Sequence, residues 1–131
     1  MIVVDSNVLA YLYLPCEYTQ EAEALLEREP DWAAPMLWRS ELRNVLLGYV
    51  RREQLTLAQA TAIQAEAEDL MRGAEYEVDS RRVLELAEKT DCSAYDCELE
   101  ALALALGTQL VTMDRRVLSG FPDVAVALNT E

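Results

Sequence analysis

Four acidic residues stand where a carboxylate could hold a metal ion. Asp5 and Asp114 each follow a short apolar run with the composition of a buried strand. Glu41 lies three residues after Trp38 on an apolar helical stripe, where an unpaired glutamate would be costly. Asp96 stands at the start of a long apolar helical segment. Hard divalent cations prefer oxygen ligands, so these acids together predict a site for such an ion.

Each acid also has an ordinary structural interpretation on local grounds. The two strand-end acids could cap the elements that follow them, and Asp96 could cap its own helix or lie in its first turn. Glu41 could reach solvent from the edge of its stripe. We expect three further acids to be a loop or cap residue and two solvated helix positions: Asp91, Glu98 and Glu100.

The sequence contains no histidine, which removes several mechanisms. Serine or cysteine nucleophiles activated by histidine are excluded, as is cleavage of RNA by histidine acid–base chemistry. Catalysis near neutral pH would have to use carboxylates, a hydroxyl, a thiol or a metal-activated water. The four acids could hold the ion or ions that activate such a water.

The net charge of −13, from 24 acidic and 11 basic residues, opposes the binding of a polyanion through a broad basic surface. A nucleic-acid function would need a metal and a few well-placed arginines. Arginine can bind phosphate through two hydrogen bonds. The candidates for this role are Arg39, Arg43, Arg115 and Arg116.

The three cysteines cannot all pair with one another, and their spacing does not fit a zinc site. We expect them to be small buried side chains in a reducing compartment. The first residues lack the basic start and small-residue cleavage site expected of a signal peptide, and no apolar run reaches the ~18 residues that a membrane span needs. These features predict a cytoplasmic protein with no membrane association.

Short apolar strands alternate with helices, which predicts one α/β domain over residues 1–131 with a central parallel sheet. Ser6 is a candidate cap for the first helix, and Gly107 ends the last long one. Ligands of such sheets bind at the carboxyl ends of the strands, so Asp5 and Asp114 should face one crevice. We expect strands at 2–4, 31–34, 76–78, 110–112 and 124–128, helices at 6–14, 18–29, 37–52, 56–72, 79–89 and 94–106, and a helical turn at 114–118.

Four segments resemble the motifs of PIN-domain ribonucleases, in the family's order and spacing. They are Val-Val-Asp-Ser-Asn-Val-Leu at 3–9, Ser-Glu-Leu-Arg-Asn-Val at 40–45, Cys-Ser-Ala-Tyr-Asp-Cys-Glu at 92–98 and Leu-Val-Thr-Met-Asp-Arg-Arg at 110–116. Within that family the chain most resembles the VapC-type toxins of type II toxin–antitoxin pairs. The resemblance covers essentially the whole chain, and four motifs in register are more specific than any one alone.

The resemblance implies a PIN-like three-layer α/β/α sandwich that cleaves RNA with Mg²⁺ or Mn²⁺. It also implies a homodimer and a small cognate antitoxin. By motif match the acidic quartet of metal-binding and catalytic residues would be Asp5, Glu41, Asp96 and Asp114. Thr112 matches the hydroxyl residue beside the last acid, and Asn7 matches the polar residue after the first.

Three other functions compete with a ribonuclease. A PIN-like module that binds partners without nuclease activity would be expected to lack part of the quartet, yet all four acids are present. A phosphorylatable receiver domain would need paired acids after the first strand and a lysine after a late strand, but the only lysine is Lys89. A metal-dependent phosphatase or DNA nuclease would differ in substrate.

Overall fold

Short apolar segments form an all-parallel sheet in the computed structural model, which describes residues 1–129. The five-stranded sheet has the order β3-β2-β1-β4-β5, with β1 at its centre. The strands are β1 (Ile2–Val4), β2 (Trp32–Pro35), β3 (Glu75–Tyr76), β4 (Leu110–Thr112) and β5 (Ala125–Ala127).

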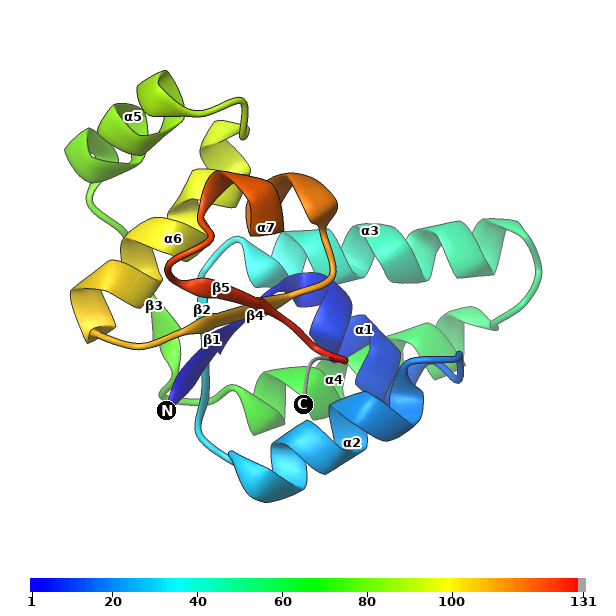
Figure 1. Cartoon of the computed structure of the whole chain (residues 1–131). Coiled ribbons are helices and arrows are strands. Elements are labelled where there is room, and N and C mark those ends of the chain that lie inside the picture. Colours follow the sequence, from blue (N-terminus) through cyan, green and yellow to red (C-terminus); the bar gives the residue numbers. More distant parts are fainter. Residues whose placement is uncertain (130–131) are drawn as a thin grey trace.

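Helices cover both faces of the sheet, as Figure 1 shows. The helices are α1 (Ser6–Tyr13), α2 (Thr19–Arg28), α3 (Trp38–Arg51), α4 (Leu57–Leu70), α5 (Ser80–Lys89), α6 (Ala94–Leu106) and α7 (Arg115–Gly120). Ile2 and Val4 of β1 join a core with α1 to α4, whereas Val3 joins a second core with α5 to α7. This alternation gives three layers and confirms the predicted α/β/α sandwich.

Most predicted boundaries agree with the structure to within one or two residues, with two local differences. The strand expected at 76–78 is only the pair Glu75–Tyr76, which lies at the edge of the sheet beside β2. The cap of α1 is Asp5 rather than Ser6, because the Asp5 side chain accepts a hydrogen bond from the backbone N–H of Asn7. Gly107 ends α6 in the left-handed conformation, with a φ of 65°, as predicted.

The sheet topology determines where a ligand can bind. β1 pairs with β2 on one side and with β4 on the other. The chain thus adds β2 and β3 on one side of β1 and then β4 and β5 on the other. A crevice opens outside the carboxyl ends of strands at such a switch point. Within residues 1–129, no helix combines the length and apolar character that crossing a bilayer requires.

Candidate active site

Asp5 lies at the carboxyl end of the central strand and is only 7% exposed. Thr112 donates a hydrogen bond from Oγ1 to Asp5 Oδ2 over 2.8 Å, and the backbone N–H of Asn7 donates to Oδ1 over 3.3 Å. Burial raises the pKa of Asp5, the two hydrogen bonds oppose this, and the charges of Asp114 and Asp96 add to the rise. The carboxylate is therefore held in position but is costly to keep charged.

Thr112 connects the ends of β1 and β4. It is fully buried as the last residue of β4, and its Oγ1 also accepts a 3.0 Å hydrogen bond from the backbone N–H of Asp114. Asp114 in turn caps α7, with Oδ1 accepting from the backbone N–H groups of Arg116 at 2.8 Å and Val117 at 3.4 Å. One carboxylate oxygen of Asp114 is thus used in capping.

Glu41 reaches the same end of the sheet from α3 and is half-buried. Burial raises the pKa of Glu41, a hydrogen bond from the Ser6 side chain opposes this, and the neighbouring charges of Asp5, Asp96 and Glu98 raise it further. A role for Ser6 near Glu41 was not predicted, because a serine after a strand is ordinarily a helix cap.

Asp96 lies in the first turn of α6 and is half-exposed. The cap of this helix is Ser93, whose Oγ accepts a 3.1 Å hydrogen bond from the backbone N–H of Asp96. The carboxylate of Asp96 is therefore not needed as the helix cap. The charge of Asp96 acts on both Asp5 and Glu41, and that of Asp114 acts on Asp5. The four acids therefore lie at the same end of the sheet, although each comes from a different element.

The side chain of Asn7 plays a smaller part than its motif position suggests. It is exposed, and the contact that Asn7 makes with Asp5 comes from its backbone N–H. The orientation of Asp5 in this structure therefore depends on the fold of the first turn of α1, together with the hydroxyl of Thr112.

The chemistry of these donors fits a hard divalent cation, because the site offers carboxylate and hydroxyl oxygens and the buried charge of Asp5 is repelled by that of the partly exposed Asp114. Over residues 1–129, however, no three acidic or cysteine side chains are already close enough to hold one ion together. Binding an ion would thus require side-chain adjustment, and it would relieve the repulsion among the acids.

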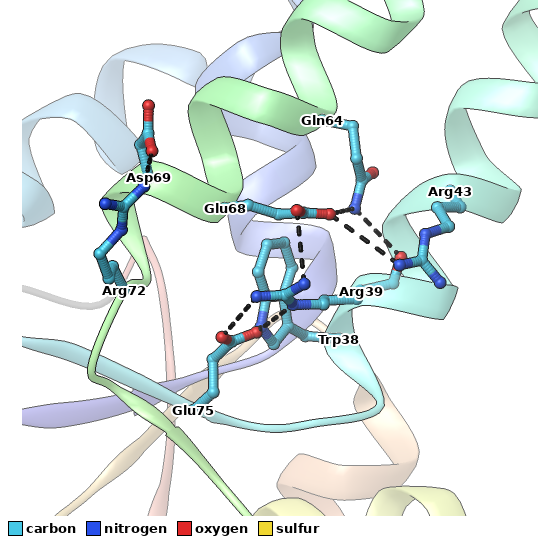
Figure 2. A network of polar contacts seen from close by, with 8 residues as sticks. All are labelled: Trp38, Arg39, Arg43, Gln64, Glu68, Asp69, Arg72 and Glu75. Atoms are coloured by element: carbon cyan, nitrogen blue, oxygen red, sulfur yellow. Dashed lines mark hydrogen bonds and ion pairs between the residues drawn. The ribbon is translucent and has the colours of Figure 1, made fainter.

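Two arginines that were candidates for binding phosphate are used elsewhere, as Figure 2 shows. Arg39 donates to both oxygens of Glu75, from Nε over 2.5 Å and from a terminal nitrogen over 2.8 Å. Arg43 lies 3.9 Å from Glu68 of α4. These contacts give Arg39 and Arg43 a structural role on the side of α3 that packs on α4 and β3. Arg115 and Arg116 are exposed beside Asp114.

The expectation that Glu98 and Glu100 are solvated was wrong for Glu100 and holds only in part for Glu98. Glu98 is half-buried and lies in a small hollow with Ser6 and Glu41. Glu100 is 5% exposed, and its Oε1 has no hydrogen-bond partner among the described residues. Helix α6 packs against α5 as well as β1 and β2, so it has little solvent-facing surface in its middle turns.

The cysteines follow the prediction only in part. Cys92 and Cys97 are buried, and all three thiols are free, but Cys16 is exposed in the turn between α1 and α2. Burial raises the pKa of both Cys92 and Cys97, so these two thiols are poor nucleophiles at neutral pH.

Comparison with known proteins identifies related chains. Ribonuclease VapC3 of Pyrobaculum aerophilum is 28% identical over 124 residues, covering 92% of this chain and 95% of that protein. FitAcB from Neisseria gonorrhoeae superposes with a TM-score of 0.76 at 15% identity, covering 98% of each chain. A toxin–antitoxin complex from Klebsiella pneumoniae gives 0.71 at 19% identity, covering 100% of each chain.

The family model for the PIN domain matches residues 2–126, which include all four strand-end and helix-borne acids of the site. The match therefore spans every helix described above and the whole sheet except the last residue of β5. Together with the shared topology of the solved structures, it shows that this chain belongs to the PIN domain family.

Proposed function

We propose that this chain is a VapC-like endoribonuclease that hydrolyses RNA phosphodiesters with Mg²⁺ or Mn²⁺ and acts as the toxin of a type II toxin–antitoxin pair. One observation carries the proposal: four acids from separate elements of a PIN domain converge on the switch point of its sheet. The similarity to Ribonuclease VapC3 and to solved toxin–antitoxin proteins supports the same function.

In this proposal the ion is held by Asp5, Glu41, Asp96 and Asp114. When bound, a divalent cation supplies a positive charge against the phosphate and lowers the pKa of a nearby water. Thr112 and the backbone of Asn7 keep the Asp5 carboxylate in place. Arg115 and Arg116 are exposed beside Asp114 and could bind the RNA phosphates that flank the cleaved bond.

Cleavage assays with purified, partner-free protein test the nuclease function. RNA should be cut with Mg²⁺ or Mn²⁺ and left intact in EDTA, and Asp5→Asn and Asp114→Asn should each abolish cutting. Asp31→Asn is the matched control, because Asp31 is exposed and precedes β2 at the opposite end of the sheet. Cleavage that persists in excess EDTA would contradict the metal mechanism, and absence of cleavage with every ion would favour a binding module.

The substrate class is tested in the same assay. Single-stranded DNA and a small phosphoester should be cut far more slowly than RNA at equal protein and metal concentrations. Preference for DNA would indicate a DNA nuclease, and preference for the small ester would indicate a phosphatase.

A cognate antitoxin is proposed as the protein partner, in the cytoplasm of the cell that makes both. A basic segment of such a partner lying over the acidic site would be electrostatically complementary to it. Expression of this chain alone should arrest growth, co-expression of the antitoxin should relieve the arrest, and Asp5→Asn should be harmless. Harmless expression of a chain that cuts RNA well in vitro would contradict the toxin role only.

We also propose a homodimer. Trp38 is buried and supplies no surface for association. Leu47 and Leu57 are exposed, and both line a hollow of about 410 Å³ between α3 and α4. Exposed apolar surface of this kind supports association. A single monomeric species in sedimentation at micromolar concentration would contradict it.

A further inference from the structure

Tyr95 presents an aromatic ring to solvent at the edge of the acidic site. It lies in the first turn of α6, next to Asp96, and is 64% exposed. Every other aromatic side chain among residues 1–129 is less exposed. Tyr95 also belongs to neither of the two hydrophobic cores on the faces of the sheet. Packing of the fold therefore does not explain why an aromatic residue stands at this position.

The rings of three other tyrosines already have partners. Tyr11 and Tyr18 pack on each other with ring centroids 5.1 Å apart, and the guanidinium of Arg52 lies 4.9 Å from the ring centroid of Tyr49. Within the part of the chain that the structure describes, no such contact is found for Tyr95. Its ring is available to a ligand.

Tyr95 lies close to the acids that would hold the metal. Together with Ser6, Glu41 and Glu98 it lines a small hollow at the carboxyl ends of β1 and β2. Glu41 belongs to the acidic quartet, and so does Asp96, the next residue along α6. A nucleotide whose phosphate lies at the quartet would therefore bring an adjacent base within reach of the ring.

An uncharged contact is valuable at this site because its surroundings repel phosphate. The chain has a net charge of −13, and Arg39 and Arg43 pair with acids of β3 and α4. Stacking of a base on an aromatic ring needs no positive charge from the protein. Such stacking typically contributes about 5- to 150-fold in affinity for each base.

We propose that Tyr95 stacks on an unpaired nucleobase of RNA beside the phosphodiester to be cut, so that the substrate is single-stranded RNA. This inference rests on the proposed ribonuclease function. Every base has a π-face, so Tyr95 would hold the strand without reading its sequence. In duplex RNA the bases are stacked within the helix and are not accessible to the ring.

Binding of a fluorescein-labelled single-stranded RNA of about 12 nucleotides, measured by fluorescence anisotropy, tests this role without cleavage as the readout. All variants carry Asp5→Asn, which should keep the RNA intact. Tyr95→Leu should weaken binding by about fivefold or more, whereas Tyr95→Phe and Tyr95→Trp should retain it. Leucine forms helices well, so the fold of α6 is preserved. The matched control is Leu84→Ala, because Leu84 of α5 is 65% exposed and should leave binding unchanged.

Two further RNAs distinguish stacking from a general effect on the surface. In a set of RNAs that each carry one abasic nucleotide, one position should remove the difference between Tyr95→Leu and its parent. A duplex of the same sequence should bind equally to both proteins.

The outcomes separate the inference from the function on which it rests. Equal binding of single-stranded RNA by Tyr95→Leu and its parent, or an equal loss with duplex RNA, would overturn the role of Tyr95. Cleavage of RNA by the wild type would then leave the proposed function standing, whereas failure of the wild type to cut any RNA would overturn both. If Tyr95→Leu weakens binding of the antitoxin but not of RNA, the ring is a protein contact and the inference is overturned.

Discussion

Glu100 is a buried carboxylate outside the acidic quartet. Its side chain lies in the middle of α6, where burial raises its pKa, Arg82 partly compensates and Asp123 adds to the rise. A carboxyl whose pKa is raised in the folded state favours folding below its ordinary pKa of 4.5, and this contribution is lost as the pH rises through the folded value. At neutral pH the charged group therefore destabilises the fold.

Glu100→Gln should accordingly stabilise the protein at pH 7 by about 1 kcal/mol, because an uncharged amide costs less to bury. The gain should shrink as the pH falls toward about 4 and the wild-type carboxyl becomes protonated. Denaturant unfolding of both proteins across this pH range measures the difference. A gain that does not depend on pH would show that the charge of Glu100 is not its cause.

The charge of Asp96 gives a second prediction at the scale of a residue. Ser93 caps α6, so Asp96→Asn keeps the cap and removes one charge that acts on Asp5 and Glu41. In EDTA the variant should be more stable than the wild type by about 1 kcal/mol. In millimolar Mg²⁺ the order should reverse, because the wild type gains metal-binding free energy that the variant largely lacks.

Thermal unfolding of the wild type and of Asp96→Asn, each with and without Mg²⁺, gives the four melting temperatures needed. Parallel behaviour of the two proteins in both conditions, with RNA cleavage intact, would mean that Asp96 does not hold metal. Since Asn and Asp stabilise a first helical turn differently by only a few tenths of a kcal/mol, that small effect alone cannot produce the predicted reversal.

At the scale of elements, the carboxylate of Glu75 joins the edge strand β3 to α3, and Arg39 of α3 extends this network to α4. Glu75 of β3 is 11% exposed by its side chain and accepts two hydrogen bonds from Arg39, and Oε2 also accepts the indole N–H of Trp38 over 2.7 Å. Arg39 also contacts Glu68 of α4. In Figure 2 these side chains from α3, α4 and β3 form one continuous network.

Glu75→Ala should destabilise the fold by about 2 kcal/mol, because the buried indole N–H of Trp38 loses its acceptor. The matched control is Asp69→Ala, which breaks the ion pair with Arg72, whose side chain is 79% exposed. That pair should contribute well under 1 kcal/mol. Similar losses in the two variants by denaturant unfolding would contradict a special role for Glu75.

The strands and helices could be predicted because their signals are local. The β-branched run at 2–4 and the apolar run at 110–112 identify strands, and the rule for parallel sheets then puts Asp5 and Asp114 at one edge. The sequence does not reveal which neighbouring element covers a helix. Arg39 and Glu100 lie on helices whose second packing surface is formed by distant elements, and a single helical period does not reveal it.

The charge of the whole molecule leads to a prediction about salt. With a net charge of −13, long-range forces repel RNA and attract a basic partner. Raising the ionic strength from about 0.05 to 0.2 M at saturating Mg²⁺ screens both effects. We expect kcat/KM for RNA to stay level or rise, and the association rate with a basic antitoxin to fall.

Stopped-flow association and initial-rate cleavage across this salt range check both halves of the prediction. A steep loss of kcat/KM with salt would show instead that a local cationic surface, such as the one around Arg115 and Arg116, dominates RNA binding. A series with a non-ionic viscogen at constant ionic strength separates screening from changes in diffusion.

The position of β1 between β2 and β4 has a consequence for synthesis on the ribosome. The hydrogen bond from Thr112 to Asp5 joins residues 107 positions apart, and Val4 pairs with Val111 in the sheet. Asp5 therefore leaves the ribosome 107 residues before Thr112. The crevice between the ends of β1 and β4 cannot assemble until β4 has been made, and we expect fragments that end before β4 to lack the proposed RNA cleavage.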